Sequence, residues 1–419
     1  MKYRSIKGTK DVLPSESGAW QAVEAAIHTV MHTFNYREIR TPVFEETSLF
    51  ARSIGELTDI VGKEMYSFED RGGTSLTLKP EMTASVIRAY IQHNLGEQQP
   101  LTKVYYIAPM FRQERPQAGR LRQFHQFGAE AIGGQQPAID AEIIALSVEI
   151  YKALGLGRFE VRINSVGCEK CRPAYKETLK KFLKPKLKEL SEESRRRFET
   201  NPFRILDSKD SADQLAIKDA PLIKDHLCAE CSTHFEEVQK GLHGFDIAFQ
   251  IDGRIVRGLD YYTKTAYEII GNDLGSQDAL AGGGRYDLLV KDLGGKSTPA
   301  VGFAAGIERL LMTLEKQGKT PAVDVHPILF LAAADDGSRE RVLAEAGSLR
   351  RNGIRCEIDL LKRSLKAQFR EADRQQAEFV AVVGERELQA DEVSIKIMRT
   401  GEEKKVRLSD LSKFFMERR

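Results

Sequence analysis

The sequence FRQERPQAGRLRQFHQFGAE, residues 111–130, predicts two antiparallel strands joined by a basic loop. Side chains two residues apart on a strand share a face, so Arg112 and Glu114 lie together on the first strand. By the same rule Gln126 and Glu130 lie together on the second strand. One face of the hairpin therefore carries a cation, two carboxylates and an amide.

A hairpin of this kind has an ordinary alternative explanation, a solvated surface with ion pairs between the strands. Its surroundings favour a binding site instead, because aromatic residues lie among the charges at Phe111, Phe124 and Phe127. The connecting loop also contains three guanidinium groups, those of Arg115, Arg120 and Arg122. Such a concentration of arginine suits phosphate groups or an RNA backbone.

The composition describes a soluble globular protein of two or three domains. The chain has 419 residues, of which 30% are charged and 41% hydrophobic. The 63 basic and 61 acidic side chains nearly cancel, so net charge does not indicate a partner, although a local basic patch could still bind a nucleic acid. No apolar run approaches the ~20 residues of a membrane span, and the N-terminus lacks the apolar segment of a signal peptide. We therefore expect no membrane association and a cytoplasmic location.

Before residue 168 the chain mixes helices and strands. Apolar periodicity predicts helices at about 16–35 and 138–154, and a third helix begins after Pro80. A hairpin turn is expected at EDRGGT, between the strand-like runs of 65–78. A short strand interrupted by Pro42 is expected within YREIRTPVFEETSLF. This mixture indicates an α+β domain with an antiparallel sheet.

The segment 168–243 differs from its surroundings because it is helical and rich in lysine. It therefore resembles an insertion into the α+β domain, which we expect to extend over 1–322. The strand-rich pattern resumes at DIAFQID, continues with a strand beginning at Tyr286, and ends with a helix over 301–317. Residues 323–419 alternate strands and helices, which predicts a separate α/β domain with a mainly parallel sheet.

Four of the five cysteines form two C-x-x-C pairs inside the apparent insertion. The pairs are Cys168 with Cys171 and Cys228 with Cys231. In a reducing compartment this pattern indicates structural zinc before a disulfide. The gap between the pairs is longer than that of a simple zinc ribbon, and four reduced thiols with His226 and His234 nearby are the alternative.

Ordered motifs along the chain resemble those of class II aminoacyl-tRNA synthetases, and most closely those of the histidyl-tRNA synthetase family. Residues 37–50, 111–130 and 301–310 resemble motifs 1, 2 and 3 of the class. RGLDYYT (257–263) and AGGGRYD (281–287) resemble the two histidine-specific signatures. GTKDVLP and LKPEMTASVIR also fit, so the resemblance covers essentially the whole chain. It implies a class II core with a helical insertion and a C-terminal anticodon-binding domain.

The resemblance also implies roles in ATP binding and catalysis. Arg112 would hold the α-phosphate, Glu114 the adenine amino group and Arg309 the γ-phosphate. Arg257 would supply positive charge where the histidine carboxylate meets the α-phosphate. Gly302 and Gly306 would allow close approach of the nucleotide. ATP would arrive with Mg²⁺.

The same resemblance implies a pocket for L-histidine, whose ring nitrogens, ammonium and carboxylate need polar partners. The implied histidine-binding residues are Glu81, Met82, Thr83, Gln126, Glu130, Tyr261 and Tyr262. Glu130 and Tyr262 would contact the imidazole nitrogens. The resemblance leaves the roles of Asp260, Arg285 and Tyr286 open.

Contacts with other macromolecules follow from the resemblance as well. The acceptor end of tRNA(His) would contact the loop residues Arg115, Gln117, Arg120 and Arg122. The motif 1 region would support a homodimer. The expected activity is ATP-dependent ligation of histidine to tRNA(His). The alternative is the regulatory subunit of ATP phosphoribosyltransferase, a synthetase paralogue that lacks the anticodon-binding domain and is therefore disfavoured by Arg257 and residues 323–419.

Overall fold

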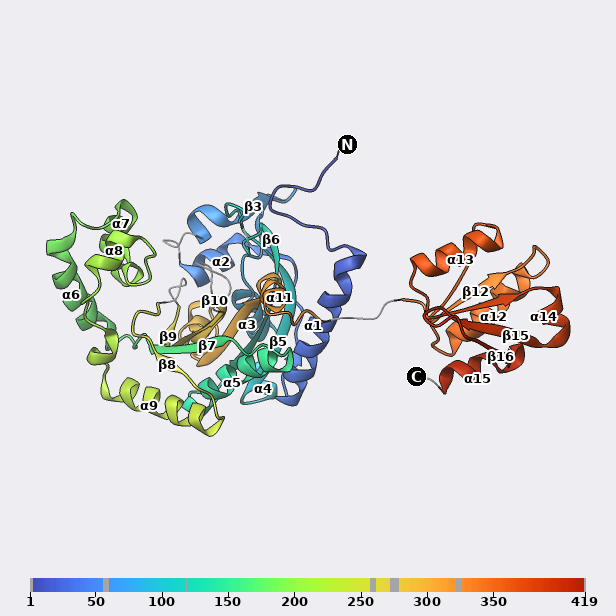
Figure 1. Cartoon of the computed structure of the whole chain (residues 1–419). Coiled ribbons are helices and arrows are strands. Elements are labelled where there is room, and N and C mark those ends of the chain that lie inside the picture. The colour runs from blue at the N-terminus through green and yellow to red at the C-terminus, as the bar shows by residue number, and fades with distance from the viewer. Residues whose placement is uncertain are drawn as a thin grey trace. The chain divides into compact units, whose positions relative to one another are not determined.

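The computed structural model describes residues 3–55, 60–117, 119–256, 261–271, 279–321 and 326–417. The chain divides into two compact units, Met1–Ala322 and Val323–Arg419 (Figure 1). The boundary falls in the segment GKTPAVDVHP, whose glycine and prolines are typical of a linker.

An eight-stranded sheet forms the centre of the first unit, in the order β1-β5-β6-β11-β10-β9-β7-β8. The strands are β1 (Arg37–Glu38), β5 (Thr102–Phe111), β6 (Gln123–Ile132), β7 (Phe159–Ser165), β8 (Gln250–Ile251), β9 (Thr263–Gly271), β10 (Ala279–Arg285) and β11 (Ala300–Gly306). All pairs from β5 to β7 are antiparallel, and only the outer pairs β1–β5 and β7–β8 are parallel among the described strands. The expected α+β core with an antiparallel sheet is therefore confirmed.

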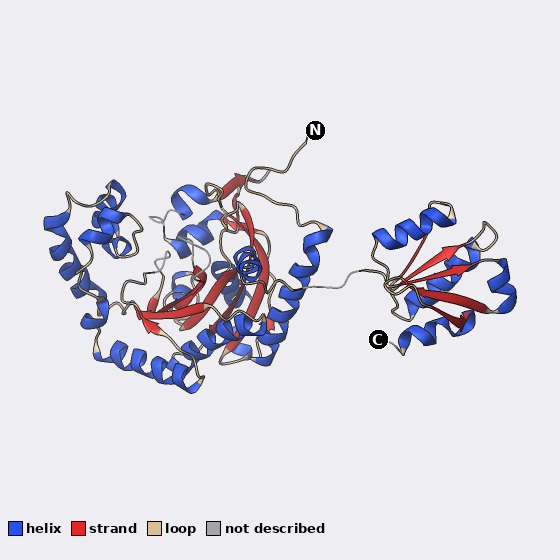
Figure 2. Cartoon of the chain, viewed as in Figure 1, coloured by secondary structure: helices blue, strands red, loops and turns tan. Residues whose placement is uncertain are grey.

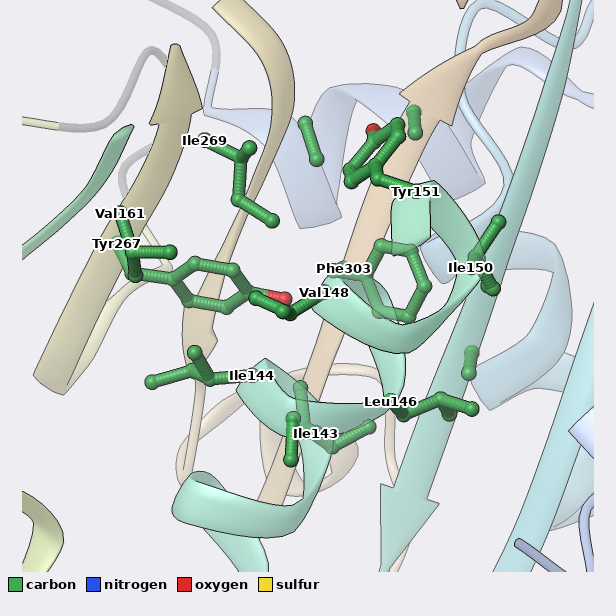
Figure 3. Close-up of a cluster of buried hydrophobic side chains, with 14 of the residues drawn as sticks. Ile143, Ile144, Leu146, Val148, Ile150, Tyr151, Val161, Tyr267, Ile269 and Phe303 are labelled. Carbon is green, nitrogen blue, oxygen red and sulfur yellow. The ribbon is translucent and has the colours of Figure 1, made fainter. Parts of the chain in front are cut away.

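Helix α5 (Pro137–Ala153) covers one face of this sheet and builds the largest hydrophobic core. Figure 3 shows its apolar side chains facing Val161, Tyr267 and Phe303 of three different strands. The hydroxyl of Tyr267 donates to Ser147 Oγ at 3.3 Å, so the phenol is satisfied inside the core. Helices α1 (Pro14–Thr33) and α11 (Ile307–Lys316) contribute further residues to the same core.

A second, three-stranded sheet carries the helix that borders the site. Its order is β2-β4-β3, with β2 (Phe44–Glu46), β3 (Tyr66–Glu69) and β4 (Ser75–Leu78). The associated helices are α2 (Thr47–Ile54), the π-helix η1 (Ile60–Glu64), α3 (Thr83–Gln92), α4 (Leu95–Gln98) and α10 (Leu289–Asp292). Helix α3 begins just after this sheet. Its N-terminus lies beside the long β5–β6 hairpin, where the Thr83 hydroxyl donates to Glu130 at 2.8 Å.

Between β7 and β8 the chain is helical (Figure 2). The helices are α6 (Arg172–Leu183), η2 (Lys184–Lys186), α7 (Glu192–Thr200), η3 (Pro202–Ile205), α8 (Ser211–Ala216), η4 (Ile223–His226) and α9 (Ala229–Gly244). They enclose a small hydrophobic cluster of their own around Tyr175, Leu179 and Ile205. Buried Asp213 accepts hydrogen bonds from the hydroxyls of Ser191, Ser194 and Ser208 at 2.6–2.8 Å.

The second unit has a five-stranded sheet in the order β13-β12-β14-β15-β16. Its elements are β12 (Leu329–Ala333), α12 (Arg339–Arg351), β13 (Cys356–Ile358), α13 (Leu365–Arg374), β14 (Phe379–Val383), α14 (Glu385–Ala390), β15 (Glu392–Ile397), β16 (Glu403–Arg407), η6 (Leu408–Asp410) and α15 (Leu411–Met416). The first three strands are parallel, as the alternation of strand and helix predicts. Two further strands, β15 and β16, add antiparallel pairs that the sequence pattern did not indicate.

Two expected elements differ in the structure. The helix predicted over 301–317 is wrong in its first half, because Ala300–Gly306 forms strand β11 and only Ile307–Lys316 is helical. The strand predicted to begin at Tyr286 is also wrong, because the glycines themselves form β10. Small residues make this possible: a Cβ at Gly283 would lie 2.4 Å from the carbonyl oxygen of Gly302 on the neighbouring strand.

Among the described residues, the helices are all too short or too polar to pass through a bilayer.

Candidate functional site

A cavity of about 290 Å³ opens over the β6, β10 and β11 region of the large sheet. Its walls come from segments distant in sequence: the β5–β6 hairpin, the start of α3, the residues before β9, and the start of α11. Predicted site residues that line it are Glu81, Thr83, Arg112, Glu114, Arg120, Gln126, Tyr261, Tyr262 and Arg309. The fold thus brings most of the sequence-predicted ATP and amino acid residues to one cavity.

The hairpin supplies a fixed guanidinium group at one side of the cavity. Arg112 Nε donates to the carbonyl oxygen of Pro80 at 2.9 Å, and its guanidinium lies 5.3 Å from the ring centre of Phe124. Glu114 lies beside it, with Oε1 3.6 Å from Arg112 Nη1 and Oε2 3.3 Å from Arg120 Nη1. The guanidinium groups of Arg112 and Arg120 and the carboxylate of Glu114 therefore lie together at the cavity wall.

Beside the hairpin, Glu81 caps the N-terminus of α3. Its carboxylate accepts the backbone N–H groups of Thr83 and Ala84 at 2.7 and 2.9 Å. Burial raises the pKa of Glu81, although these two backbone donors oppose the shift. The carboxylate therefore has both a structural role at the helix start and a position in the cavity wall.

Glu130 lies beneath the cavity and is only 1% exposed. It does not line the cavity directly, but Oε1 accepts the Thr83 hydroxyl at 2.8 Å and Oε2 accepts the Tyr286 hydroxyl. Burial raises the pKa of Glu130 to about 8, despite the two hydroxyl donors, and the nearby carboxylate of Glu81 adds to the rise. A carboxyl group with a pKa near neutral pH can either accept a hydrogen bond from a substrate nitrogen or donate one to it.

The position of the Glu130 side chain leaves room only for glycine at residue 302. The two residues are paired in register across β11 and β6, and a Cβ on Gly302 would lie 1.6 Å from Glu130 Oε2 and 2.6 Å from the carbonyl oxygen of Ala129. A side chain at residue 302 would thus be excluded by atoms of the protein itself, and not only by a bound nucleotide. At Gly306, by contrast, the nearest atom to an added Cβ is Arg309 Cγ at 3.9 Å, so space remains toward the cavity.

Replacing Gly302 with Ala is expected to displace Glu130 and destabilise the first unit by roughly 2–3 kcal/mol, because backbone and carboxylate must both move. Thermal unfolding and histidine binding would measure the two effects. Gly157→Ala is the matched control, since an added Cβ there meets nothing within 4 Å. A Gly302→Ala protein as stable as that control would contradict the packing described here.

Three phenols form the aromatic wall. The ring centres of Tyr261 and Tyr262 are 4.8 Å apart, and those of Tyr261 and Tyr286 are 5.6 Å apart. Burial raises the pKa of Tyr261 and Tyr286 well above the usual value, so both remain protonated hydrogen-bond donors. Arg257 and Asp260, which precede these tyrosines, lie outside the described residues.

Arg309 lines the cavity from the first turn of α11. Its Nε donates to the carbonyl oxygen of Gly119 at 3.0 Å, and its Nη1 donates to that of Ala279 at 2.9 Å. The guanidinium is thus held by the motif 2 loop on one side and β10 on the other. Neighbouring Glu308 accepts the backbone N–H of His125 at 2.9 Å, which fixes α11 against β6.

The remaining predicted loop residues lie beside the cavity. Arg115, Gln117 and Arg120 line an adjacent hollow together with Lys63 and Glu64. Arg122 instead contacts the N-terminal segment, and its backbone N–H donates to the carbonyl oxygen of Gly8 at 2.7 Å. These placements leave their predicted role in tRNA contact untested.

The structure refines the expectations for three residues. Met82 is 1% exposed, belongs to a hydrophobic core and does not line the cavity, so its neighbours Glu81 and Thr83 are the polar contributors. Tyr286, whose role was open, joins the site through its hydrogen bond to Glu130. Arg285 is wholly buried and pairs with Asp140, so it supports the wall from behind. The signal for Tyr286 was its place in AGGGRYD, but its partner depended on the strand register.

Comparison with known proteins agrees with this geometry. Residues 8–310 match the Histidyl-tRNA synthetase family, and residues 330–418 match the Anticodon binding domain family. The chain belongs to the histidyl-tRNA synthetase family. It is 49% identical to the histidine–tRNA ligase of Caldanaerobacter subterraneus, with 99% of each chain covered, and 52% identical to that of Chloroherpeton thalassium, with 98% and 97% covered.

A solved structure supports the same assignment. The apo histidyl-tRNA synthetase of S. aureus superposes with a TM-score of 0.84, at 38% identity and with 99% of each chain covered. The class II core and the C-terminal anticodon-binding domain are therefore both present. A histidyl-tRNA synthetase of this kind is a histidine–tRNA ligase, and the anticodon-binding domain favours it over the regulatory paralogue.

The four paired cysteines of this synthetase also converge. All four Sγ atoms lie within 4.8 Å of one another, although Cys168 and Cys171 precede α6 while Cys228 and Cys231 begin α9. Cys168 Sγ is 3.6 Å from Cys171 Sγ and 3.9 Å from Cys228 Sγ. Tetrahedral zinc with Zn–S bonds of ~2.3 Å requires S–S separations of ~3.8 Å, so this set of thiols can hold a metal ion.

Proposed function

We propose that the cavity activates L-histidine with ATP and that the resulting histidyl group is transferred to tRNA(His). A carboxylate oxygen of histidine attacks the α-phosphorus, the bond to the β-phosphate oxygen breaks, and pyrophosphate leaves. The terminal ribose hydroxyl of the tRNA then attacks the acyl carbon and releases AMP. The observation that carries the proposal is one cavity that combines buried acceptors for an amino acid with guanidinium groups for a triphosphate.

The proposed histidine subsite rests on three groups of polar atoms. Oε1 of Gln126 is buried and accepts no hydrogen bond from any residue that the structure describes, which suits the substrate ammonium. Glu81 and Thr83 line the same cavity. Glu130 and Tyr262 would contact the imidazole nitrogens, and Tyr261 would pack against the ring. A site of paired polar atoms rejects apolar isosteres because its own groups would be left unpaired.

The proposed ATP subsite uses the hairpin and α11. Arg112 would bind the α-phosphate, Glu114 would accept the adenine amino group, and Arg309 would bind the γ-phosphate. Their guanidinium groups are already held by backbone carbonyls, so little reorganisation is needed when charge develops on the phosphate. ATP would enter as its Mg²⁺ complex, which reduces the charge that the protein must neutralise.

Replacing Arg257 with His is expected to lower histidine activation on the order of hundreds-fold, with a much smaller effect on histidine binding. The expectation comes from the sequence, in which Arg257 begins RGLDYYT. A guanidinium remains protonated in a desolvated pocket, whereas an imidazole does not. Single-turnover adenylate formation would measure the effect, and a variant with normal turnover would remove Arg257 from the reaction.

Contacts beyond the cavity remain proposals. Arg115, Gln117, Arg120 and Arg122 would contact the tRNA acceptor end, and the second unit would bind the anticodon. A homodimer through the motif 1 region, residues 37–50, and a cytoplasmic location stay predictions from the sequence. Sedimentation would test the dimer.

We further infer that zinc is the metal of the four cysteines, because thiolates are soft ligands and the set is complete without water. The bound ion would serve structure, since no open coordination position would remain. Protein purified without chelators is expected to contain about one zinc ion per chain.

The direct test of ligation is attachment of labelled histidine to a tRNA(His) transcript. The chain is expected to esterify the transcript in an ATP-dependent manner. Binding of histidine and ATP without any transfer to tRNA would instead favour the regulatory class of paralogue, in which histidine is sensed but not ligated.

A further inference from the structure

We propose that the metal site of the four cysteines positions the histidine pocket by tying the base of the helical insertion to the segment just before β9 that carries Tyr262. The inference rests on the proposed function of the cavity, because it assigns the metal a role in histidine binding. It assigns to Arg172 and His234 the role of positioning residues.

The four cysteines lie where the chain leaves the large sheet and where it returns. Cys168 and Cys171 follow β7, and Cys228 and Cys231 begin α9, so one ion would join both crossings. The turn is tight, because Cys171 N–H donates to the carbonyl oxygen of Cys168 at 3.0 Å. Across the cluster, the backbone N–H of Cys228 donates to Cys171 Sγ at 3.1 Å, a contact that would orient a thiolate ligand.

The first link to the pocket runs through Arg172, which follows Cys171 directly. Its Nη2 donates to the carbonyl oxygen of Tyr262 at 2.5 Å, and its Nε donates to that of Val166 at 3.1 Å. Lys264, two residues after Tyr262, has a left-handed backbone with φ of 49°. Its side chain donates to Glu230 of α9 at 3.0 Å. The backbone that presents Tyr262 is therefore held from both crossings of the insertion.

The second link runs along α9. His234 lies three residues after Cys231, on the same side of the helix, and is buried. Its Nε2 is 3.2 Å from Asp140 Oδ1 and 3.3 Å from Thr265 Oγ1. Asp140 in turn pairs with Arg285, the residue before Tyr286, whose hydroxyl donates to Glu130. Both Tyr262 and Tyr286 are thus supported from the cysteine cluster.

These links explain why a metal at this position would act on one substrate and not the other. Without the ion, the four cysteines share only weak hydrogen bonds, so the two crossings lose their common ligand bonds. The insertion keeps its own hydrophobic cluster and remains folded, but its junction with β9 loosens. The ATP-side residues Arg112 and Arg309 are held by Pro80, Gly119 and Ala279, none of which lies in the insertion.

The test measures zinc content and the separate dissociation constants of histidine and ATP by calorimetry. In the double variant Cys228→Ser with Cys231→Ser, we expect zinc to be lost, the Kd for histidine to rise about tenfold, and the Kd for ATP to change less than about twofold. Cys356→Ser is the matched control, because this buried cysteine lies in the second unit, outside the cluster. It should keep zinc and both affinities.

Arg172→Met separates the link from the metal, and it keeps the proposal testable if the double cysteine variant does not fold. This variant should retain about one zinc ion and still bind histidine about tenfold more weakly. Lys181→Met changes an exposed cation of the same helix and should leave both unchanged.

Three results would overturn the proposal: wild-type protein without zinc, zinc loss with unchanged histidine affinity, or unchanged histidine affinity in Arg172→Met. Absence of histidine binding in the wild-type protein would instead refute the proposed function itself.

Discussion

Replacing Glu130 with Gln is expected to lower kcat/KM for histidine activation by about 10³-fold or more. The carboxyl group is buried, and its two oxygens are already aligned by Thr83 and Tyr286. With a pKa of about 8 the carboxyl group can accept from an imidazole N–H or donate a proton to the ring, whereas an amide cannot ionise and its own N–H groups would face the ring donor. The ATP affinity should change little, because the proposed triphosphate contacts are those of Arg112 and Arg309.

The same substitution is expected to make the protein more stable at alkaline pH. The pKa of Glu130 rises from the ordinary 4.5 to about 8 because of burial, so between these values the native state binds a proton that the unfolded chain has released. Stability therefore falls as pH rises through this window. Glu130→Gln removes that loss, and its advantage over the wild type should grow by roughly 1–3 kcal/mol between pH 5 and pH 9.

Asp213→Asn is the matched control with the opposite sign. Burial alone would raise the pKa of Asp213, but the hydroxyls of Ser194, Ser208 and Ser191 together lower it. That carboxylate therefore stabilises the protein above its unfolded pKa, and Asp213→Asn should lose stability at neutral pH without changing histidine activation. If Glu130→Gln also lost stability as pH rose, or kept wild-type histidine activation, Glu130 would not have the environment described.

Replacing Arg112 with Gln is expected to reduce the rate of adenylate formation by about 10³-fold, the range for loss of one preorganised charged donor. Its hydrogen bond to Pro80 and its packing on Phe124 hold the guanidinium in place before ATP binds. Pre-steady-state formation of the adenylate at saturating ATP would measure the loss. Glutamine keeps polarity but removes both the charge and the planar fork.

Arg162→Gln provides the comparison for Arg112. Arg162, on β7 of the large sheet, is likewise an arginine paired with a carboxylate, that of Glu160 at 2.8 Å, but it does not line the cavity. We expect less than about a twofold change there, because partly exposed ion pairs contribute little. Equal losses at the two positions would mean that Arg112 acts through general stability rather than through the phosphate.

The hairpin could be predicted from the sequence because its chemistry and its geometry are both local. Alternation predicts Gln126 with Glu130, and the structure places both on β6, which pairs with β5 from Phe111 and Gln123 to Thr102 and Ile132. The predicted place of Arg112 and Glu114 on the first strand is wrong, because β5 ends at Phe111, although the two side chains do lie 3.6 Å apart. The spacing of the cysteines likewise predicted a cluster of four, and the structure brings their thiols together. In both cases a short periodic pattern carries the information.

The support around Glu130 could not be predicted in the same way. Gly302 faces Glu130 only because of the register of β11 against β6, and the Tyr286 hydroxyl reaches it from beyond the end of β10. Both contacts join residues far apart in the chain, and no local periodicity encodes them. The strand at 300–306 was itself hidden, because small apolar residues before a helix resemble a continuation of that helix.

The central claim is that one cavity joins histidine to ATP. Histidine-dependent exchange of labelled pyrophosphate into ATP measures that reaction without tRNA. We predict exchange with L-histidine and none with other amino acids of similar size, such as glutamine. Absence of exchange in protein that binds both histidine and ATP would contradict the account.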